Sequence, residues 1–288
     1  MPMGFPSAGL ESGLKYQPGP DDIFVCSYPK CGTTWVQYIV YMLTHGGQSL
    51  PAGQTLATVF PHLEEVGRDQ VAVQHAPRLI KTHLPRSMTP FGTDAKYIYV
   101  ARNPFDCAVS FYHHTRGFVK HYDFADGSFD EFLECFLSGE VDFGDYFDHL
   151  LSFLPSEQDQ QLLHLTYEAT KVDPRATILA IGQFLGEHAR ESVSSTEMID
   201  RIVKETSFDH MRQDQRRWSS ERPQDMPEFV RKGVVGDWQS HFSPQLAQRL
   251  LSRFEQRTRG TAAAGWWSDI LDAARLFANR EGRDKATY

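Results

Sequence analysis

The chain has 288 residues, of which 41% are hydrophobic and 23% charged, and this composition is typical of a folded globular protein rather than a disordered one. Its formal net charge of −8 argues against broad nucleic-acid binding, because that function usually requires an overall basic surface. The four cysteines argue against a disulfide framework and lack the C-x-x-C spacing of a structural zinc site, so we expect reduced thiols and no bound metal.

The first part of the chain is rich in glycine, proline and serine. Residues 1–20 are therefore expected to form an irregular N-terminal arm ahead of a single domain that spans residues 21–288. The arm has no basic segment followed by an apolar run, so we expect no signal peptide. The most apolar helical stretch, residues 35–43, is about half the length of about 20 residues that a membrane span requires. These features predict a cytoplasmic protein without a membrane partner.

Predicted strands alternate with predicted helices along the chain. Short apolar or β-branched runs indicate strands over residues 23–26, 78–82, 96–101 and 162–166. Capping residues, prolines and glycines indicate helices over residues 35–43, from 104 to about 118, after a capping box formed by Ser128 and Glu131, from 174 to about 186, and from 244 to 259. This order predicts an α/β fold in which helices cover both faces of a parallel sheet.

The loop after the first strand has the composition of an anion-binding site. It reads Y-P-K-C-G-T-T-W over residues 28–35 and enters a helix, whose first N–H groups and dipole favour a bound anion. Gly32 permits close approach of a ligand, Lys30 adds a positive charge, and Thr33 and Thr34 add hydroxyl donors. The lysine precedes the glycine, so the loop differs from the G-x-x-x-x-G-K-[ST] form. Taken alone, a plain turn capped by threonine explains these residues equally well.

Two further segments bring cations to places where an anion could bind. Arg102 ends the third strand, at the edge where open α/β sheets bind ligands, and Ser110 lies two turns into the next helix. Arg231, Lys232 and Gly233 begin the segment R-K-G-V-V-G-D-W, which suits a flexible loop closing over a phosphate. In isolation the arginine would be interpreted as an ion-pairing residue, and the second segment as a solvated basic turn.

A histidine follows the second strand in the segment L-I-K-T-H-L-P. A histidine suits the role of a general base, because its unperturbed pKa of about 6.5 lies near physiological pH. The chain has 12 histidines, so His83 alone carries little information and could simply cap the strand.

Together these segments resemble, in the same order, the motifs of the cytosolic sulfotransferase family, over residues from about 21 to 245. The resemblance implies a P-loop-like nucleotide site in a single α/β domain. It also implies an enzyme that transfers the sulfuryl group of 3′-phosphoadenosine-5′-phosphosulfate (PAPS) to the hydroxyl or amine of a small acceptor such as a phenol, catecholamine or sterol. The product nucleotide would be adenosine 3′,5′-bisphosphate (PAP), and no metal would be required.

The resemblance also implies roles for individual residues. The 5′-phosphosulfate would be held by Lys30, Cys31, Gly32, Thr33 and Thr34, and the adenine and ribose would be contacted by Trp35, Tyr167, Thr206 and Phe208. The 3′-phosphate would be held by Arg102, Ser110, Arg231, Lys232 and Gly233. His83 would take the acceptor proton while Lys30 and Lys81 stabilise the charge of the reaction. The family usually has Ser where this chain has Cys31, so one hydroxyl contact is expected to be lost or replaced by a weaker thiol.

Some properties stay open at this point. The family's dimer motif K-x-x-x-T-V-x-x-x-E aligns with residues 239–248, where Gln, Ser, Pro and Gln replace Lys, Thr, Val and Glu, so the chain could be a monomer or a homodimer. Alternative functions are a Golgi carbohydrate sulfotransferase, a nucleotide-binding protein without turnover and a P-loop kinase. The aromatic residues that could line an acceptor pocket, or equally belong to the core, are Phe60, Phe111, Tyr112, Phe118 and Phe143.

Overall fold

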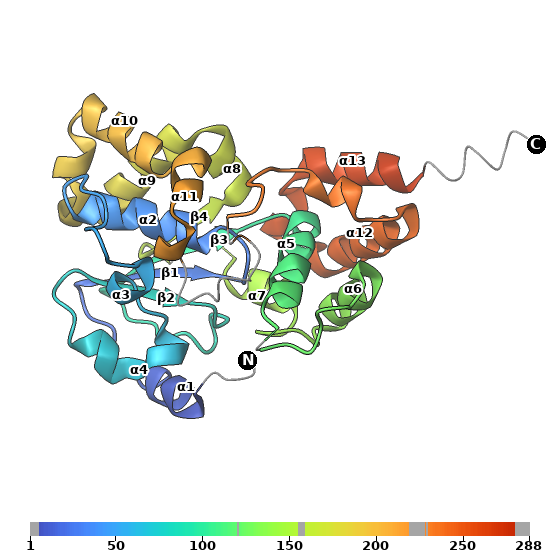
Figure 1. Cartoon of the computed structure of the whole chain (residues 1–288), viewed down its shortest axis with the longest axis horizontal. Helices are drawn as coiled ribbons and strands as arrows, with labels where there is room; N and C mark the ends of the chain where they lie inside the picture. Colours follow the sequence, from blue (N-terminus) through green and yellow to red (C-terminus); the bar gives the residue numbers. More distant parts are fainter. Residues whose placement is uncertain (1–5, 120, 155–158, 219–227, 229, 280–288) are drawn as a thin grey trace, which may run out of the picture.

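The computed structural model describes residues 6–119, 121–154, 159–218, 228 and 230–279. Within these residues a parallel four-stranded sheet has the order β2-β1-β3-β4 (Figure 1). Its strands are β1 (Asp22–Ser27), β2 (Arg78–Thr82), β3 (Lys96–Ala101) and β4 (Leu162–Thr166). The predicted strands are therefore confirmed, and the first is one residue longer at each end. The parallel register brings the carboxyl ends of all four strands to one edge of the sheet.

The central strand β1 is apolar along its length because both of its faces are buried. Phe24 and Cys26 face a hydrophobic cluster that includes side chains of α5, α6, α7, α12 and α13. Ile23 and Val25 face a second cluster, built with α2, α9 and α10. In Figure 1, α2, α9 and α10 lie above the sheet, and α5, α6, α12 and α13 form a helical layer at its right. The predicted α/β architecture is confirmed.

The helices predicted from capping signals are all present. They are α2 (Thr33–Thr44), α5 (Pro104–Gly117), α6 (Phe129–Ser138), α9 (Pro174–Leu185) and α12 (Pro244–Thr258). Asn103 caps α5 through the backbone N–H of Asp106, and Ser128 and Glu131 form the predicted capping box of α6. In the described part of the chain, the helices not predicted are α1 (Ser7–Gly13), α3 (Leu56–Val59), α4 (Leu63–Ala72), α7 (Tyr146–Ser152), α8 (Tyr167–Val172), α10 (Thr196–Glu205), α11 (Phe208–Gln213) and α13 (Ser268–Ala278). Among the described residues no helix is long and apolar enough to span a bilayer.

The N-terminal arm is not wholly irregular, and that expectation is corrected here. Residues 1–5 lie outside the described residues, but α1 occupies the middle of the arm and packs on α4. A Cβ atom at Gly9 would lie 2.4 Å from the backbone oxygen of Glu65, and one at Gly13 would lie 2.9 Å from that of Leu63. The glycines that suggested an irregular segment therefore permit two helices to approach closely. The extent of the single domain predicted over residues 21–288 stays a prediction, and residues 280–288 are outside the described part.

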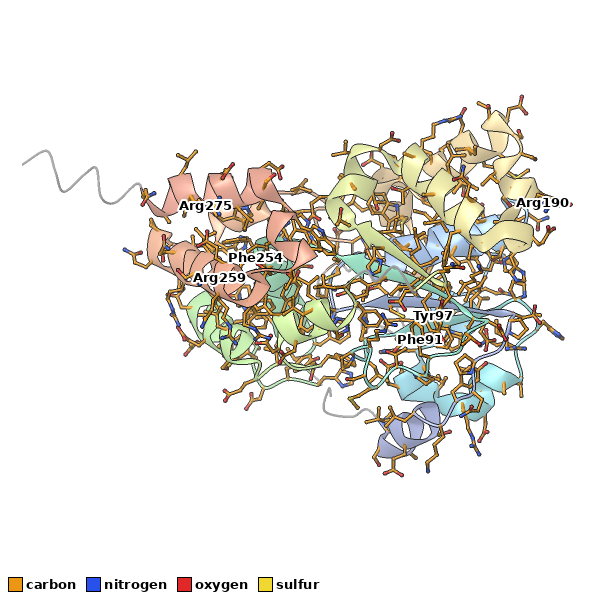
Figure 2. The ribbon with its side chains drawn as sticks, turned by 180° about the vertical axis from the view of Figure 1, so that it is seen from behind. Phe91, Tyr97, Arg190, Phe254, Arg259 and Arg275 are labelled. Atoms are coloured by element: carbon orange, nitrogen blue, oxygen red, sulfur yellow. The ribbon has the colours of Figure 1, made fainter. Side chains whose placement is uncertain are left out.

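Aromatic side chains fill much of the cluster that faces α5 and α12. Figure 2 shows it from behind, with Tyr97 of β3 stacked on Phe91 at a ring-centroid distance of 4.1 Å and at 4.8 Å from Phe24 of β1. On the far side of this layer, Phe254 of α12 lies edge-on to Trp267, at 6.2 Å. Rings of this size remove large apolar areas from water, so this cluster contributes much of the apolar burial that stabilises the sheet.

Candidate active site

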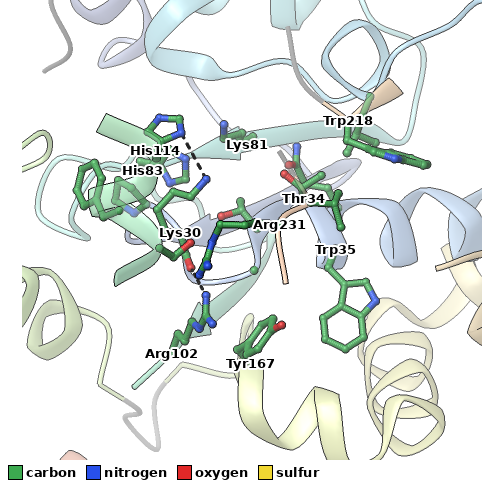
Figure 3. Close-up of a pocket in the computed structure, with 18 of the residues that line it drawn as sticks. Lys30, Thr34, Trp35, Lys81, His83, Arg102, His114, Tyr167, Trp218 and Arg231 are labelled. Atoms are coloured by element: carbon green, nitrogen blue, oxygen red, sulfur yellow. Dashed lines mark hydrogen bonds between the residues drawn. The ribbon is translucent and has the colours of Figure 1, made fainter. Parts of the chain in front are cut away.

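A cavity of about 480 Å³ opens at the carboxyl edge of the sheet (Figure 3). Each strand supplies a residue to it or leads into one: the loop after β1, His83 after β2, Arg102 after β3 and Tyr167 after β4. The cavity brings together nearly every residue predicted for the site, namely Lys30, Gly32, Thr33, Thr34, Trp35, Lys81, His83, Arg102, Ser110, Tyr167, Thr206, Phe208, Arg231, Lys232 and Gly233. These residues come from positions between 30 and 233 of the chain, so their convergence on one cavity is a property of the fold.

The loop between β1 and α2 has the geometry of an anion cradle. Gly32 has φ of 96° and precedes α2, and a Cβ atom at this position would lie 2.7 Å from Cδ2 of Tyr167. Only glycine fits this left-handed and confined position. In the part of the chain that the structure describes, no side chain caps the first turn of α2. Its N–H groups and the positive end of the helix dipole therefore point to an anionic ligand.

Cys31 is the predicted site residue that does not line the cavity. Its thiol is 1% exposed and its Sγ lies 3.8 Å from Sγ of Cys107 on α5, and 3.8 Å from the backbone oxygen of Pro29. Burial raises the pKa of the Cys31 thiol well above its ordinary value. Of the two expectations, a lost hydroxyl contact or a weaker thiol contact, the geometry favours the first, because the side chain points into the core and leaves only the backbone beside the cradle.

His83 is held in one orientation by its backbone and its ring. Its Nδ1 lies 2.7 Å from the carbonyl oxygen of Ser27, and its backbone N–H donates to Oε1 of Glu64 at 2.6 Å. A carbonyl oxygen only accepts hydrogen bonds, so Nδ1 carries the proton and Nε2 of a neutral ring is left as the acceptor. Burial, followed by the charges of Lys81 and His62, holds the pKa of His83 well below its ordinary value.

Lys81 lies on β2 two residues before His83 and also lines the cavity. Burial lowers the pKa of Lys81, while the carboxylates of Glu64 and Glu65 oppose that shift. The pKa of Glu64 is itself lowered, since its interactions with His62 and the backbone N–H of His83 outweigh its complete burial. The carboxylates of Glu64 and Glu65 partly compensate the positive charge of Lys81. Lys81 can therefore stay charged beside the imidazole of His83.

A second cation of the cavity comes from the loop after β1. Nζ of Lys30 lies 3.4 Å from Nδ1 of His114 on α5, and Figure 3 shows both side chains beside His83. Lys30 has a positive φ of 68°, an uncommon conformation for a residue with a side chain. This backbone turn aims its ammonium group into the cavity, where Lys81 approaches from the neighbouring strand.

Arg102 forms the centre of the opposite end of the cavity. Its Nη1 donates to the carbonyl oxygen of Lys30 at 3.3 Å, and its Nη2 donates to that of Val234 at 3.2 Å. The guanidinium carbon lies 4.3 Å from the ring centroid of Tyr167, a cation–π geometry. The residue is 8% exposed, and among the described residues its buried Nε has no hydrogen-bond partner. A buried cation with an unused donor is suited to an anionic ligand.

Arg231 and Lys232 approach the same end from a separate loop. Nη2 of Arg231 lies 2.5 Å from one carboxylate oxygen of Asp237, and Nζ of Lys232 lies 2.6 Å from the other. Partial burial disfavours the charged carboxylate, but hydrogen bonds from Lys232 and Arg231 outweigh it and lower the pKa of Asp237 to about 2. The two cations are thus held by an internal anion at the mouth of the cavity.

Aromatic rings line the remaining wall. Trp35 lies edge-on to Tyr167, with ring centroids 5.6 Å apart, and Nζ of Lys171 lies 5.8 Å from the ring of Phe208. Trp218 also lines the cavity, and it was not predicted because no local pattern distinguishes it from a core tryptophan. Flat apolar surfaces of this kind suit a purine ring.

The residues that contact His83 were not predicted from the sequence. The carboxylate of Glu64 comes from α4, and Nε2 of His149 on α7 lies 3.1 Å from the backbone oxygen of His83. The ring of His62 lies edge-on to that of His83 at 5.1 Å. The segment H-L-E at residues 62–64 was the available signal, but its meaning depends on the packing of α4 beside β2.

Comparisons with known proteins agree with this geometry. The family model described as a sulfotransferase domain matches residues 20–262. Sulfotransferase 1C2 of Rattus norvegicus is 36% identical over 258 residues, which cover 84% of this chain and 85% of that protein. Sulfotransferase 1E1 of Homo sapiens is 34% identical over 259 residues, with coverage of 85% and 86%.

A solved structure has the same fold over nearly the whole chain. The crystal structure of mouse sulfotransferase SULT7A1 complexed with PAP has a TM-score of 0.73 and 28% sequence identity, and the alignment covers 94% of this chain and 93% of that one. The domain match spans more than half of the chain, and the curated relatives exceed 30% identity over most of it. The chain therefore belongs to the sulfotransferase family and is a sulfotransferase.

Proposed function

We propose that the protein transfers the sulfuryl group of PAPS to the hydroxyl group of a small acceptor, with His83 as the general base. The observation that carries this proposal is the contact between Nδ1 of His83 and the carbonyl oxygen of Ser27 at 2.7 Å. It leaves Nε2 as a proton acceptor in a cavity that also holds Lys30 and Lys81. A base beside two cations is what an in-line transfer of an anionic group requires.

The distribution of charge supports a nucleotide with an anion at each end. Lys30 and the first turn of α2 would hold the 5′-phosphosulfate, together with Gly32, Thr33 and Thr34. Arg102 with Ser110, and Arg231, Lys232 and Gly233, would hold the 3′-phosphate. The unused donor of Arg102 and the confined Gly32 both fit such a ligand. Trp35, Tyr167, Thr206 and Phe208 would contact the adenine and ribose, and the mouse protein with the same fold binds PAP.

The chemistry of the proposed step is a displacement at sulfur. When bound, PAPS supplies the activated sulfuryl group and leaves as PAP. Nε2 of His83 accepts the proton of the acceptor hydroxyl as its oxygen forms the new bond to sulfur. Lys30 and Lys81 stabilise the negative charge on the transferring group and on the oxygen that leaves it. The low pKa of His83 keeps its ring neutral before the acceptor binds.

The acceptor end of the cavity supports a small aromatic or other apolar acceptor. Phe60, Phe111, Phe118 and Phe143 line it, and the ring of Phe143 lies 5.3 Å from that of His83. Tyr112 is not among the lining residues, since it packs on the rings of α6. An apolar pocket beside the base suits phenols, catecholamines or sterols. We further propose a cytoplasmic enzyme whose partners are small molecules rather than nucleic acids or membranes.

Transfer of a labelled sulfuryl group from PAPS tests this proposal. The purified protein is incubated with a simple phenol, a catecholamine and a sterol, and the sulfate ester is measured for the wild type, His83→Ala and the control His75→Ala. His75 is an exposed histidine in the loop before β2. We expect ester from the wild type and the control, and at least about a hundredfold less from His83→Ala. Binding of PAP without any ester from these acceptors would favour a nucleotide-binding protein without turnover.

A further inference from the structure

Two histidines form a pair just outside the cavity. Nε2 of His113 on α5 lies 2.9 Å from Nε2 of His241, which follows the short 3-10 turn Asp237–Ser240. The rings are nearly perpendicular, with an interplanar angle of 85° and centroids 5.0 Å apart. Both residues are half-buried, and neither lines the cavity. An effect of this pair on the reaction would therefore pass through other residues.

The direction of the hydrogen bond in this pair follows from its neighbours. Nδ1 of His241 lies 3.2 Å from the backbone oxygen of Asp237, which can only accept, and 3.1 Å from the Ser240 hydroxyl, which donates its proton to that same oxygen at 2.8 Å, so Nδ1 carries a proton. A neutral His241 ring then has its lone pair on Nε2, and Nε2–H of His113 is the donor. Burial, followed by the charge of Arg231, lowers the pKa of His113 to about 4, so its ring is neutral near pH 7. The pair is thus a hydrogen bond in which α5 donates, through His113, to His241 at the end of the turn.

The turn controls the two cations at the mouth of the cavity. The backbone oxygen of Asp237 accepts from His241, while its carboxylate binds Arg231 at 2.5 Å and Lys232 at 2.6 Å. A shift of the Asp237 backbone would therefore move both cations. His113 also stands three residues, about one helical turn, after Ser110, a residue that lines the cavity. The pair links the helix that presents Ser110 to the turn that holds the cations.

A second contact between the same two elements makes this link effective. The carboxylate of Asp106, in the first turn of α5, accepts the backbone N–H of Gly236 at 2.8 Å and that of Trp238 at 3.1 Å. His113 is seven residues further along α5, about two helical turns away. The Asp106 contacts, with the buried ring of Trp238 lying 5.0 Å from that of Phe105, hold the start of the turn. The contact between His113 and His241 holds the end of the turn against the same helix.

We propose that the hydrogen-bonded pair of His113 and His241 positions Arg231 and Lys232, through Asp237, for the 3′-phosphate of the nucleotide. This inference rests on the proposed function, which assigns these cations to that phosphate. Loss of the pair leaves unchanged the loop before α2, which would hold the 5′-phosphate, and the aromatic residues Trp35, Tyr167 and Phe208, which would contact the adenine and ribose. It therefore weakens the binding of a nucleotide that has a 3′-phosphate and spares one that lacks it, a difference that a general loss of structure would not produce.

Calorimetric titration with PAP and with adenosine 5′-monophosphate tests this positioning role. The proteins are the wild type, His113→Leu, His113→Gln, His241→Asn and the control His75→Gln. For His113→Leu and His241→Asn we expect the Kd of PAP to rise about three- to tenfold, the effect of one lost hydrogen bond. The Kd of adenosine 5′-monophosphate should stay within about twofold. His113→Gln should recover most of the affinity for PAP, since its amide N–H can donate to Nε2 of His241.

The outcomes separate this inference from the proposed function. An unchanged Kd of PAP, or an equal rise for both nucleotides, overturns the positioning role while the preference of the wild type for PAP still stands. A wild type that binds both nucleotides equally overturns the assignment of the cations and the inference with it. If His113→Leu has no cooperative thermal transition, His241→Asn gives the decisive result, because it retains a donor to Asp237 and loses the contact with His113.

Discussion

Nδ1 of His83 lies 2.7 Å from the carbonyl oxygen of Ser27, the last residue of β1. β1 pairs with β2, the strand that His83 follows, so adjacent strands set both the position of the ring and its tautomer. The ring of the proposed base is thus oriented by a backbone carbonyl oxygen of the sheet, while the carboxylate of Glu64 holds its backbone N–H. Because a carbonyl oxygen does not titrate, this orientation is kept at any pH at which the protein is folded.

Replacing His83 by Ala should separate turnover from nucleotide binding. We expect kcat to fall by about 10²- to 10⁴-fold, the usual contribution of a general base. The Kd of PAP should change by less than about threefold, since the proposed phosphate contacts come from other residues. Initial rates and calorimetric titration measure the two effects, with His75→Ala as the control. Near-normal turnover in the variant would remove His83 from the mechanism.

The protonation of His83 should respond weakly to mild acid. Its buried ring has a pKa well below the ordinary value of 6.5, so its NMR signal should keep its neutral position from about pH 7.5 to about pH 6. The unfolded chain binds a proton in this range that the folded ring does not, so this group makes the protein less stable as the pH falls through 6.5. The signal is assigned by its loss in His83→Ala. A titration midpoint at or above 6.5 would contradict the proposed neutral base.

Substitution of Cys31 by Ser should have little effect on the nucleotide. The thiol packs against Cys107 at 3.8 Å and is 1% exposed, so the new hydroxyl would point into the core. We expect the Kd of PAP to change by less than about threefold. Titration of the variant and the wild type under the same conditions measures this. A tenfold or larger gain in affinity would mean that the side chain reaches the ligand.

Loss of either proposed 3′-phosphate cation should weaken PAP binding, but to different extents. Arg102 is 8% exposed, and its removal should raise the Kd by about 30-fold or more, as expected for buried charge-assisted contacts. The side chain of Lys232 is 49% exposed, so Lys232→Ala should cost about tenfold or less. Lys15→Ala, at an exposed position of the arm, is the control. A larger rise in Kd for Lys232→Ala than for the Arg102 variant would contradict the proposal that Arg102 makes the main contact with the 3′-phosphate.

The free energy of unfolding should depend on Asp22, the first residue of β1, at the end of the strand opposite the cavity. This residue is 0% exposed; its carboxylate accepts from Nε of Arg78 at 2.5 Å, from the Tyr16 hydroxyl at 2.8 Å and from the Gly19 N–H at 2.8 Å. Asp22→Asn should lower the free energy of unfolding by about 3 kcal/mol, because it leaves the arginine without its charge partner. Urea unfolding measures the change, with the neighbouring Asp21→Asn as the control. Equal effects of the two substitutions would show that the ion pair is not responsible.

The strands and the main helices could be predicted because their signals are local. β2, β3 and β4 are short apolar runs between turn residues, and Asn103 with Pro104 marks the start of α5 by capping chemistry alone. The helix α1 could not be predicted in this way. Gly9 and Gly13 weaken a helix in isolation, and their value appears only when α4 packs against them.

The candidate site was predicted in part for the same reason. Motifs locate Lys30, His83 and Arg102 on the loops that follow strands, and the parallel sheet then brings these loops to one edge. The direction of a side chain is not contained in a motif. Cys31 turns into the core because Cys107, 76 residues away, packs beside it. The contact of Glu64 with His83 likewise depends on how α4 docks beside β2.

A crystal structure with both PAP and an acceptor phenol bound would show the direction of the nucleotide and the position of the acceptor together. We expect the 5′-phosphate against the first turn of α2, the 3′-phosphate beside Arg102, and the acceptor oxygen within about 2.6–3.2 Å of Nε2 of His83. A nucleotide bound in the reverse direction would contradict this expectation, as would an acceptor hydroxyl out of reach of that nitrogen.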